Sequence, residues 1–350
     1  MLRRALAPAL ACAVALPAAA ETVSVTVVAG HPPVFRWVRI ASEVYIPAVN
    51  AALEGTGHAV AWSEQYGGAL AGVGEELETV EQGLAELGLV SSLFDPSKLA
   101  IQNVTYVTPF VSADHSAVAG MIDRLQETDP RMRASWEANG LEYLGCAIGI
   151  DDYLLMTDFP VESLADLEGR KIGAPGPAVT WLEGTGAVGV SGNLTTYYNE
   201  IKSGVYDGVI VFASAALPGK LHEVAPYVTK MGFGAQYAGG MAANKPWYDG
   251  LPEPVQVALK GACDAYSEAY DADLDAAVAT ALEVMRAEGA TVTEAPQEMR
   301  EAWAAGMDNV AKAWAGRLDE SGQPGTEVLE LYMESMREAG AEPVRDWDRE

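Results

Sequence analysis

Few of the residues that usually carry catalytic or metal chemistry occur in this chain of 350 residues. It has three cysteines, and its four histidines, His31, His58, His115 and His222, are widely spaced. They form no HExxH or CxxC motif, which would gather metal ligands on one helix or turn. The chain also lacks the G-x-S-x-G turn of many serine hydrolases. We therefore predict neither a metal site nor a catalytic centre, although a hydrolase assembled from distant residues stays an alternative.

The composition excludes two classes of partner. Acidic residues number 49 against 22 lysines and arginines, which gives a formal net charge of −27. Nucleic acids and anionic lipid surfaces carry phosphate and attract basic faces, so we expect neither as a partner. Hydrophobic residues make up 49% of the chain, which is enough for the core of an ordinary globular protein.

The first twenty residues have the pattern of an export signal. Arg3 and Arg4 precede an apolar run over residues 5–17, and Ala18 and Ala20 supply the small residues of an A-x-A cleavage site. The run is shorter than the ~20 residues that span a bilayer. We expect residues 1–20 to be a signal peptide cleaved after Ala20, and the mature chain to be periplasmic and not inserted into the membrane.

Two cysteines, Cys146 and Cys263, belong to the predicted mature chain. They could pair there, because disulfides persist in oxidising compartments. However, they are far apart in the sequence, and nothing local fixes the geometry that a disulfide requires. A disulfide and two free thiols therefore both stay open.

The first part of the mature chain alternates strands with helices. Residues 22–29 alternate β-branched residues and end at Gly30. The pattern continues with strands at 58–62, from 87 and at 141–149, and with helices at 37–54, 74–87 and 115–139. This order predicts a largely parallel sheet covered by helices.

A second α/β series begins after residue 150. It has strands from 170 and at 205–212, helices at 194–203 and 221–226, and a strand-like segment at 235–243. Residues 255–287 then contain few helix breakers, and a helix of that length, about 50 Å, would span two lobes. Helices at 296–318 and 325–339 follow, and we expect residues 346–350 to fray.

A ligand of such a fold would bind where strands end. Parallel sheets bind ligands at the carboxyl ends of their strands, and two facing lobes form a cleft that closes by a hinge motion. The segments at these ends are rich in glycine, aromatic and short polar residues: 30–33, 63–68, 91–94, 151–153, 173–176 and 211–213. They contain no convincing acid–base pair, which favours binding over catalysis.

Three stretches resemble motifs of the DctP-type solute receptors of TRAP transporters (tripartite ATP-independent periplasmic transporters). They are PVESLADLEGRKI at 160–172, YNEIKSGVYDG at 198–208, and EVAPYV at 223–228 followed by NKPWYDGLP at 244–252. Together with the signal peptide and the long helix, their order and spacing extend the resemblance over essentially the whole mature chain.

The resemblance implies an α/β, two-lobed periplasmic-binding-protein-like fold, similar to type II, with a long helix spanning both lobes. Lobe 1 would comprise residues 21–150 and about 236–265, and lobe 2 residues 151–235 and about 266–350. Such a receptor captures a small-molecule solute between its lobes and delivers it to the TRAP membrane permease subunits. It is not an enzyme and uses no cofactor.

The chain departs from the family where the ligand is usually held. The resemblance implies a carboxylate-binding arginine directly after the Lys-Ile of the first motif, since a guanidinium fork suits a carboxylate, but that position is Gly173. A second family arginine falls on Tyr153, and an asparagine becomes Val211, beside Phe212. We therefore expect an apolar or aromatic ligand rather than a simple C4-dicarboxylate. Its site would include Tyr153, Gly173, Trp181, Leu194, Val211 and Phe212.

Several alternatives stay open. Ring faces combined with Asp151, Asp152 or Glu64 could hold a cation, and the same carboxylates could bind Ca²⁺. An organic acid such as a C4-dicarboxylate could instead be held by Arg36 or His31 in the first lobe. A receptor whose ligand is sensed by a signalling partner, without transport, would carry the same residues.

Overall fold

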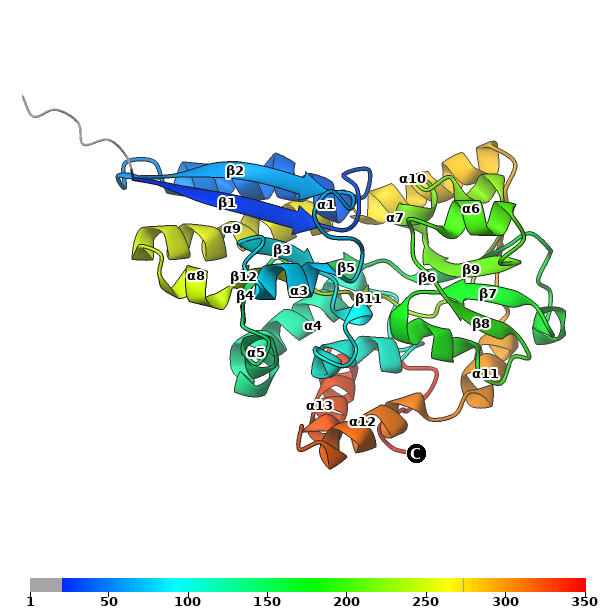
Figure 1. Cartoon of the computed structure of the whole chain (residues 1–350). Coiled ribbons are helices and arrows are strands. Elements are labelled where there is room, and N and C mark those ends of the chain that lie inside the picture. Colours follow the sequence, from blue (N-terminus) through cyan, green and yellow to red (C-terminus); the bar gives the residue numbers. More distant parts are fainter. Residues whose placement is uncertain (1–20, 273) are drawn as a thin grey trace, which may run out of the picture.

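The computed structural model describes residues 21–272 and 274–350 and has an α/β fold with two main β-sheets (Figure 1). The predicted signal peptide, residues 1–20, lies outside the described residues. One main sheet has five strands and the other six, and a small two-stranded sheet lies between them. The two-lobed α/β fold class predicted from the sequence is confirmed.

The first sheet has the strand order β2–β1–β3–β12–β4. β1 (Glu21–Ala29) runs parallel to β2 (His58–Tyr66) and to β3 (Leu87–Val90). β12 (Gly240–Asn244) is antiparallel to β3 and to β4 (Leu141–Gly145), although it comes from a much later part of the chain. β3 is buried along its whole length, as expected for a central strand whose two faces are covered.

The predicted helix 37–54 is present as one continuous helical run of α1 (Arg36–Ile40), a π-helical turn (Ala41–Tyr45) and α2 (Ile46–Ala52), whereas the other two predicted helices of this lobe are shorter or divided. Pro47 lies within this run, directly after the wider π-helical turn, in which the Ile46 N–H donates to the Ala41 carbonyl. The predicted helix 74–87 is α3 (Glu76–Glu81). The predicted helix 115–139 divides at Asp129, which caps the second piece, into α4 (His115–Thr128) and α5 (Pro130–Glu137).

The second sheet has the strand order β13–β10–β6–β9–β7–β8. Its strands are β6 (Tyr153–Thr157), β7 (Lys171–Ala174), β8 (Val188–Ser191), β9 (Gly208–Phe212), β10 (Tyr227–Lys230) and β13 (Thr291–Glu294). The sequence patterns predicted β7 and β9 but not the other four. β6 and β9 are both fully buried and show no alternation of polar and apolar residues, but β9 is rich in β-branched residues whereas β6 contains a Leu-Leu-Met run, which is why β6 was missed.

The chain crosses between the two main sheets in three places. Two crossings pair as the small antiparallel sheet of β5 (Gly149–Ile150) and β11 (Gln236–Tyr237). The third is the long helical region, in which α9 (Glu253–Ala272) packs against α1 and α2, and α10 (Leu274–Ala287) packs against α7 (Ala213–Ala216) and β13. Figure 1 shows α9 below β1 and β2 of the first sheet, and α10 close to α7 beside the second sheet.

The C-terminal helices differ from the predicted division into lobes. α11 (Gln297–Gly306) packs on the second lobe, where the Trp303 indole N–H donates to the Trp181 carbonyl at 2.6 Å. α12 (Val310–Glu320) and α13 (Gly325–Glu338) instead lie against the 3₁₀ turn Thr105–Val107 and against α4. These two helices therefore pack on residues of lobe 1, although the sequence placed residues 266–350 in lobe 2.

The end of the chain is held against the first lobe. Trp347 is fully buried, and its indole N–H donates to the Pro109 carbonyl at 2.7 Å. Arg337 forms an ion pair with Asp348 at 2.5 Å. The expectation that residues 346–350 fray was wrong, because the buried indole offsets the entropy of ordering a chain end.

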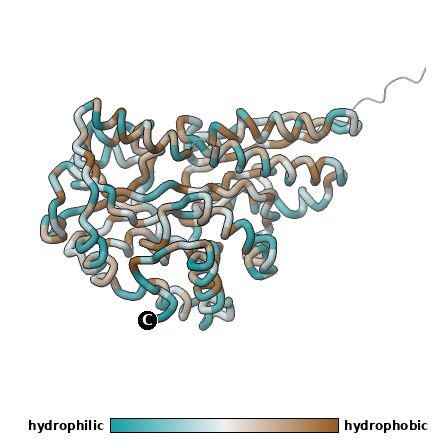
Figure 2. Tube along the Cα trace, turned by 180° about the vertical axis from the view of Figure 1, so that it is seen from behind, coloured by the Kyte–Doolittle hydropathy of each residue, from teal (hydrophilic) through white to brown (hydrophobic). Residues whose placement is uncertain are grey.

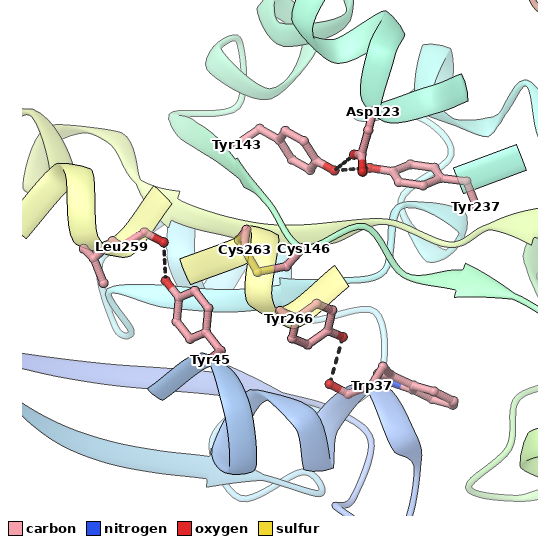
Figure 3. The surroundings of a disulfide bond; sticks show 9 residues. All are labelled: Trp37, Tyr45, Asp123, Tyr143, Cys146, Tyr237, Leu259, Cys263 and Tyr266. Atoms are coloured by element: carbon pink, nitrogen blue, oxygen red, sulfur yellow. Dashed lines mark hydrogen bonds between the residues drawn. A yellow bond between two sulfur atoms is a disulfide. The ribbon is translucent and has the colours of Figure 1, made fainter. Parts of the chain in front are cut away.

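A disulfide fastens the long helical region to the first sheet (Figure 3). Cys146, the residue after β4, is bonded to Cys263 in α9, which resolves the pairing that the sequence left open. Two tyrosines strengthen the same junction. Tyr45 donates to the Leu259 carbonyl at 3.0 Å, and Tyr266 donates to the Trp37 carbonyl at 2.9 Å.

The lobes share one hydrophobic core. The largest buried cluster contains Val27 and Tyr106 of the first lobe and also Tyr153 and Phe212 of the second. Figure 2 shows hydrophobic segments within the fold and hydrophilic residues at many turns and helix ends of its periphery. In residues 21–272 and 274–350, no helix has both the length and the apolar character needed to cross a bilayer.

Candidate functional site

A cavity of about 40 Å³ lies between the two lobes. Six aromatic residues line it: Trp37, Phe94 and Tyr106 from the first lobe, and Tyr153, Tyr197 and Phe212 from the second. Most of the other lining residues are aliphatic, namely Leu93, Ile148, Ile150, Leu194, Ile210 and Val211. The polar lining residues are His31, Ser91 and Asn193. The site is therefore predominantly apolar and has few hydrogen-bonding groups.

Strand and helix ends place these residues. His31 follows the end of β1, and the 3₁₀ turn Ser92–Phe94 follows the end of β3. Because β1 and β3 are parallel, these ends meet at one edge of the sheet, where such folds bind ligands. On the other side, Tyr153 at the start of β6 pairs with Phe212 at the end of β9.

Aromatic contacts join the two lobes across the cavity. The hydroxyls of Tyr106 and Tyr153 are hydrogen-bonded at 2.9 Å, and the ring centroids of Trp37 and Phe212 are 6.0 Å apart. The remaining space would hold only a few water molecules. A larger solute can therefore enter only if the lobes separate or the lining side chains move.

Trp181 lies behind the lining and does not form part of it. Its ring stacks on Tyr106 with centroids 5.9 Å apart and meets the edge of Tyr153 at 5.4 Å. Its indole N–H donates to the Tyr106 carbonyl at 2.7 Å. Trp181 thus supports two lining rings from opposite lobes, whereas the sequence placed it in the lining itself.

Two lining side chains carry buried polar atoms without a hydrogen-bond partner among the described residues. They are Nε2 of His31 and the hydroxyl of Tyr197, whose residues are 5% and 1% exposed. Burial lowers the pKa of His31 from 6.5 to about 4, so its imidazole is neutral near pH 7. Burial also raises the pKa of Tyr197 well above its usual value, so the phenol stays protonated. Both groups can therefore form neutral hydrogen bonds.

Gly173 does not face the cavity. A Cβ atom built on it would lie 3.0 Å from the Tyr206 ring and 3.1 Å from Val209. The structure therefore fills the space beside this position with an aromatic ring and a branched side chain. A longer side chain at 173 would have to displace them before reaching any ligand.

The predicted acidic residues also lie away from the cavity lining. Glu64, in β2, accepts a hydrogen bond from Ser42, and Asp152 accepts one from the Gly234 N–H at 2.8 Å. Asp151 is buried and accepts a hydrogen bond from the Ser214 N–H at 3.2 Å. Within the part of the chain that the structure describes, no three His, Cys, Asp or Glu residues group to hold a metal ion.

The alternative acid-binding residue Arg36 is also outside the lining. Its guanidinium donates to the carbonyls of Ala269 and Tyr270 at 2.7 and 3.1 Å, near the end of α9. No arginine or lysine lines the cavity among the residues described. Of the predicted site residues, the structure thus brings together His31, Tyr153, Leu194, Val211 and Phe212.

Sequence reasoning missed four of the aromatic lining residues. Phe94 lay within a strand-end segment that the sequence marked, so its position was available but not used. Trp37 lies in a helix and Tyr106 in a 3₁₀ turn, where an aromatic residue is more often part of the core. Tyr197 begins α6 (Tyr197–Lys202), within a stretch that the sequence marked only as a helix.

An apolar cavity between two lobes that the chain links by several crossings is the arrangement that suits a solute receptor. The model of the bacterial extracellular solute-binding protein family 7 (DctP) matches residues 51–317. The match covers most of the chain, and the protein therefore belongs to this family.

Solved structures of similar fold extend over nearly the whole chain. DctP7 of Bordetella pertussis, an extracytoplasmic solute receptor binding pyroglutamic acid, is 18% identical, with a TM-score of 0.77 over 89% of this chain and 99% of that one. The ectoine-binding protein of the TeaABC TRAP transporter of Halomonas elongata is 20% identical, with a TM-score of 0.76 over 90% and 100%.

A third similar structure is a TRAP periplasmic solute-binding protein from Sulfitobacter sp. NAS-14.1 with bound β-D-galacturonate. It is 18% identical, with a TM-score of 0.74 over 89% of this chain and 100% of that one. At these identities the likeness concerns the fold, and the ligands belong to those proteins.

Proposed function

We propose that this protein is the exported solute receptor of a TRAP-type secondary transporter. It captures a small organic molecule between its lobes and delivers it to the permease subunits in the membrane. Family membership and the two-lobed fold support this proposal. The signal-peptide pattern of residues 1–20 adds a periplasmic location, with cleavage after Ala20. The receptor transforms nothing and needs no cofactor.

The ligand of this receptor is an uncharged molecule that is mainly apolar or aromatic. The observation that carries this proposal is the composition of the cavity, which has six aromatic residues and neither arginine nor lysine in its lining. Burying a carboxylate without a partner costs roughly several kcal/mol of binding free energy. We therefore expect the cavity to reject organic acids. The neutral state of His31 near pH 7 points the same way.

A cationic ligand is the second candidate. The aromatic lining favours it, because the faces of Trp, Tyr and Phe rings attract cations. The acidic residues that would complete such a site, Glu64 and Asp152, are engaged elsewhere by Ser42 and Gly234. A cation would therefore depend on ring faces alone, which makes it the weaker candidate.

Isothermal titration calorimetry with a panel of compounds tests the function. The panel contains succinate and malate as organic acids, tetramethylammonium as a cation, and phenol and cyclohexanol as uncharged cyclic compounds. We expect binding of the uncharged compounds, with micromolar to millimolar Kd. Micromolar binding of succinate or malate would contradict the proposed ligand class while leaving the receptor function in place. The absence of any binding would contradict the receptor function for this range of solutes.

A further inference from the structure

Two side chains that line the cavity each carry a buried polar atom without a hydrogen-bond partner among the described residues, and they come from opposite lobes. His31 Nε2 belongs to the first lobe, at the end of β1, and the Tyr197 hydroxyl to the second, at the start of α6. A buried polar group without a partner costs free energy, roughly 1–3 kcal/mol in proteins. Two such groups on side chains that line the same apolar cavity therefore need an explanation beyond folding.

The surroundings of His31 hold its ring without satisfying Nε2. The ring meets Phe35 and Trp37 edge to face, with centroids 5.6 and 5.2 Å apart, and Phe94 at 6.4 Å. These contacts are apolar, so they fix the orientation of the imidazole and offer no hydrogen bond. Tyr197 is held in a similar way, since its ring meets the edge of the Tyr206 ring at 6.1 Å.

The other hydroxyls of the aromatic lining are different. Tyr106 and Tyr153 are hydrogen-bonded to each other at 2.9 Å, so their polar atoms are already paired. Three described rings of the lining, those of His31, Tyr197 and Trp37, carry a hydrogen-bonding group without a partner, but only at His31 and Tyr197 is that atom fully buried. The fully buried, unpaired hydrogen-bonding atoms of the described lining thus lie at two points, one on each lobe.

We infer that His31 and Tyr197 are the two hydrogen-bonding residues that select the ligand and join it to both lobes. This inference rests on the proposed receptor function and specifies its solute: an uncharged, compact cyclic molecule with one hydroxyl or carbonyl group, of the class of phenols and cyclic alcohols. The rings of the lining contact its apolar body. The polar group bonds to the imidazole of one lobe and the phenol of the other, which favours the closed arrangement when the ligand is present.

The test compares phenol with toluene by titration calorimetry on the full mature protein. The two probes have similar rings, but only phenol has a hydroxyl group. Wild-type protein should bind phenol at least tenfold more tightly than toluene. Tyr197→Phe, which removes only the hydroxyl, should weaken phenol binding about three- to tenfold and leave toluene binding unchanged. His31→Leu should have the same effect on the preference for phenol.

Tyr270→Phe is the matched control. Tyr270 is also buried, and its hydroxyl also lacks a partner among the described residues, but it does not line the cavity. Its loss should leave the binding of both probes unchanged. Thermal unfolding of each variant without ligand shows whether its fold is intact. If His31→Leu has a folding defect, the result for Tyr197→Phe decides whether the inference holds.

Four results would overturn the inference. Equal affinity of the wild-type protein for phenol and toluene would show that the two polar atoms do not select the ligand. An unchanged preference in Tyr197→Phe would exclude the role of its hydroxyl. Tight binding of benzoate with no binding of phenol would exclude the uncharged class but leave the receptor function intact. If none of these compounds binds, the inference fails, and the receptor function is contradicted for this range of solutes.

Discussion

At the scale of single residues, the site combines many rings with very few free polar atoms. Gly173 shows how closely its second-lobe surroundings are packed, because a Cβ atom there would lie 3.0 Å from the Tyr206 ring. Tyr206 is itself 3% exposed, so it has little room to move. The packing around Gly173 thus leaves no room for a larger residue at this position.

Substitution of Gly173 should therefore lower stability without creating an acid site. Gly173→Ala should reduce the free energy of unfolding by about 1–3 kcal/mol, because overpacking strains neighbouring side chains. Gly173→Arg should reduce it at least as much and bring no affinity for succinate. Denaturant unfolding and calorimetry check the two parts. Gly120→Ala is the control, since a Cβ atom at this helical position meets nothing within 4 Å. A stable Gly173→Arg protein that binds succinate would contradict this account.

At the scale of elements, the crossings between lobes position the cavity. The segment that contains Ile148 and Ile150 begins at Cys146, and α9 holds the Trp37 carbonyl through the Tyr266 hydroxyl. The Cys146–Cys263 bond joins these two structural units. Because it closes a long loop, it also restricts the unfolded chain.

Loss of this disulfide should destabilise the fold. The double variant Cys146→Ala/Cys263→Ala should lose about 2–4 kcal/mol of unfolding free energy. Guanidinium titration of the wild-type protein, with and without a reducing agent, gives an independent measurement of the same effect. The reducing agent should leave the double variant unchanged. Identical unfolding midpoints for oxidised and reduced wild-type protein would show that the bond contributes nothing.

The sequence predicted which segments contribute to the site better than it predicted which side chains line the cavity. Tyr153 and Val211 were found because they fall where the resemblance places a family arginine and asparagine, and Phe212 follows Val211 at a strand end that the sequence marked. The sequence placed Trp181 in the lining, but the residue lies behind Tyr106. The prediction failed because spacing along the chain does not tell which of two neighbouring rings is nearer the cavity. Tyr197 was missed because its position at the start of a helix does not show that its side chain lines a cavity.

The strands and the C-terminus were likewise predicted only in part. Strands β1, β7 and β9 followed from their composition, whereas β6 was missed because its Leu-Leu-Met run lacks the β-branched residues that mark the equally buried β9. The buried C-terminus was mispredicted because its polar and charged residues conceal one anchoring tryptophan, Trp347. Long-range packing decided these cases, and a single sequence does not display it.

At the scale of the whole molecule, buried carboxyl groups make stability depend on pH. Burial raises the pKa of Glu76 to about 7. Burial likewise raises the pKa values of Asp95, Asp123, Asp151 and Asp152 to about 6. The folded state therefore binds these protons more tightly than the unfolded state does. Stability should increase as the pH falls from about 8 to about 5.

His31 acts in the opposite direction. Folding lowers the pKa of His31 from 6.5 to about 4. At pH values below 6.5, the unfolded chain therefore binds a proton at His31 more readily than the folded chain, which lowers stability. Five carboxyl groups outweigh one imidazole, and we expect the Tm at pH 5.5 to exceed that at pH 8 by several degrees. Thermal unfolding monitored by circular dichroism measures this difference. Glu76→Gln should reduce the pH dependence between pH 6 and 8, and a higher Tm at pH 8 than at pH 5.5 would contradict the assignment.

The most direct test of the central claim is the identity of the small molecule that the protein carries from its natural host. Mass spectrometry of the low-molecular-mass fraction released by denaturing the purified protein gives this identity. We predict a compact uncharged compound with a cyclic apolar body and one hydroxyl or carbonyl group, at near-stoichiometric amount. A dicarboxylate, a sugar acid or another organic anion bound in that amount would contradict the account.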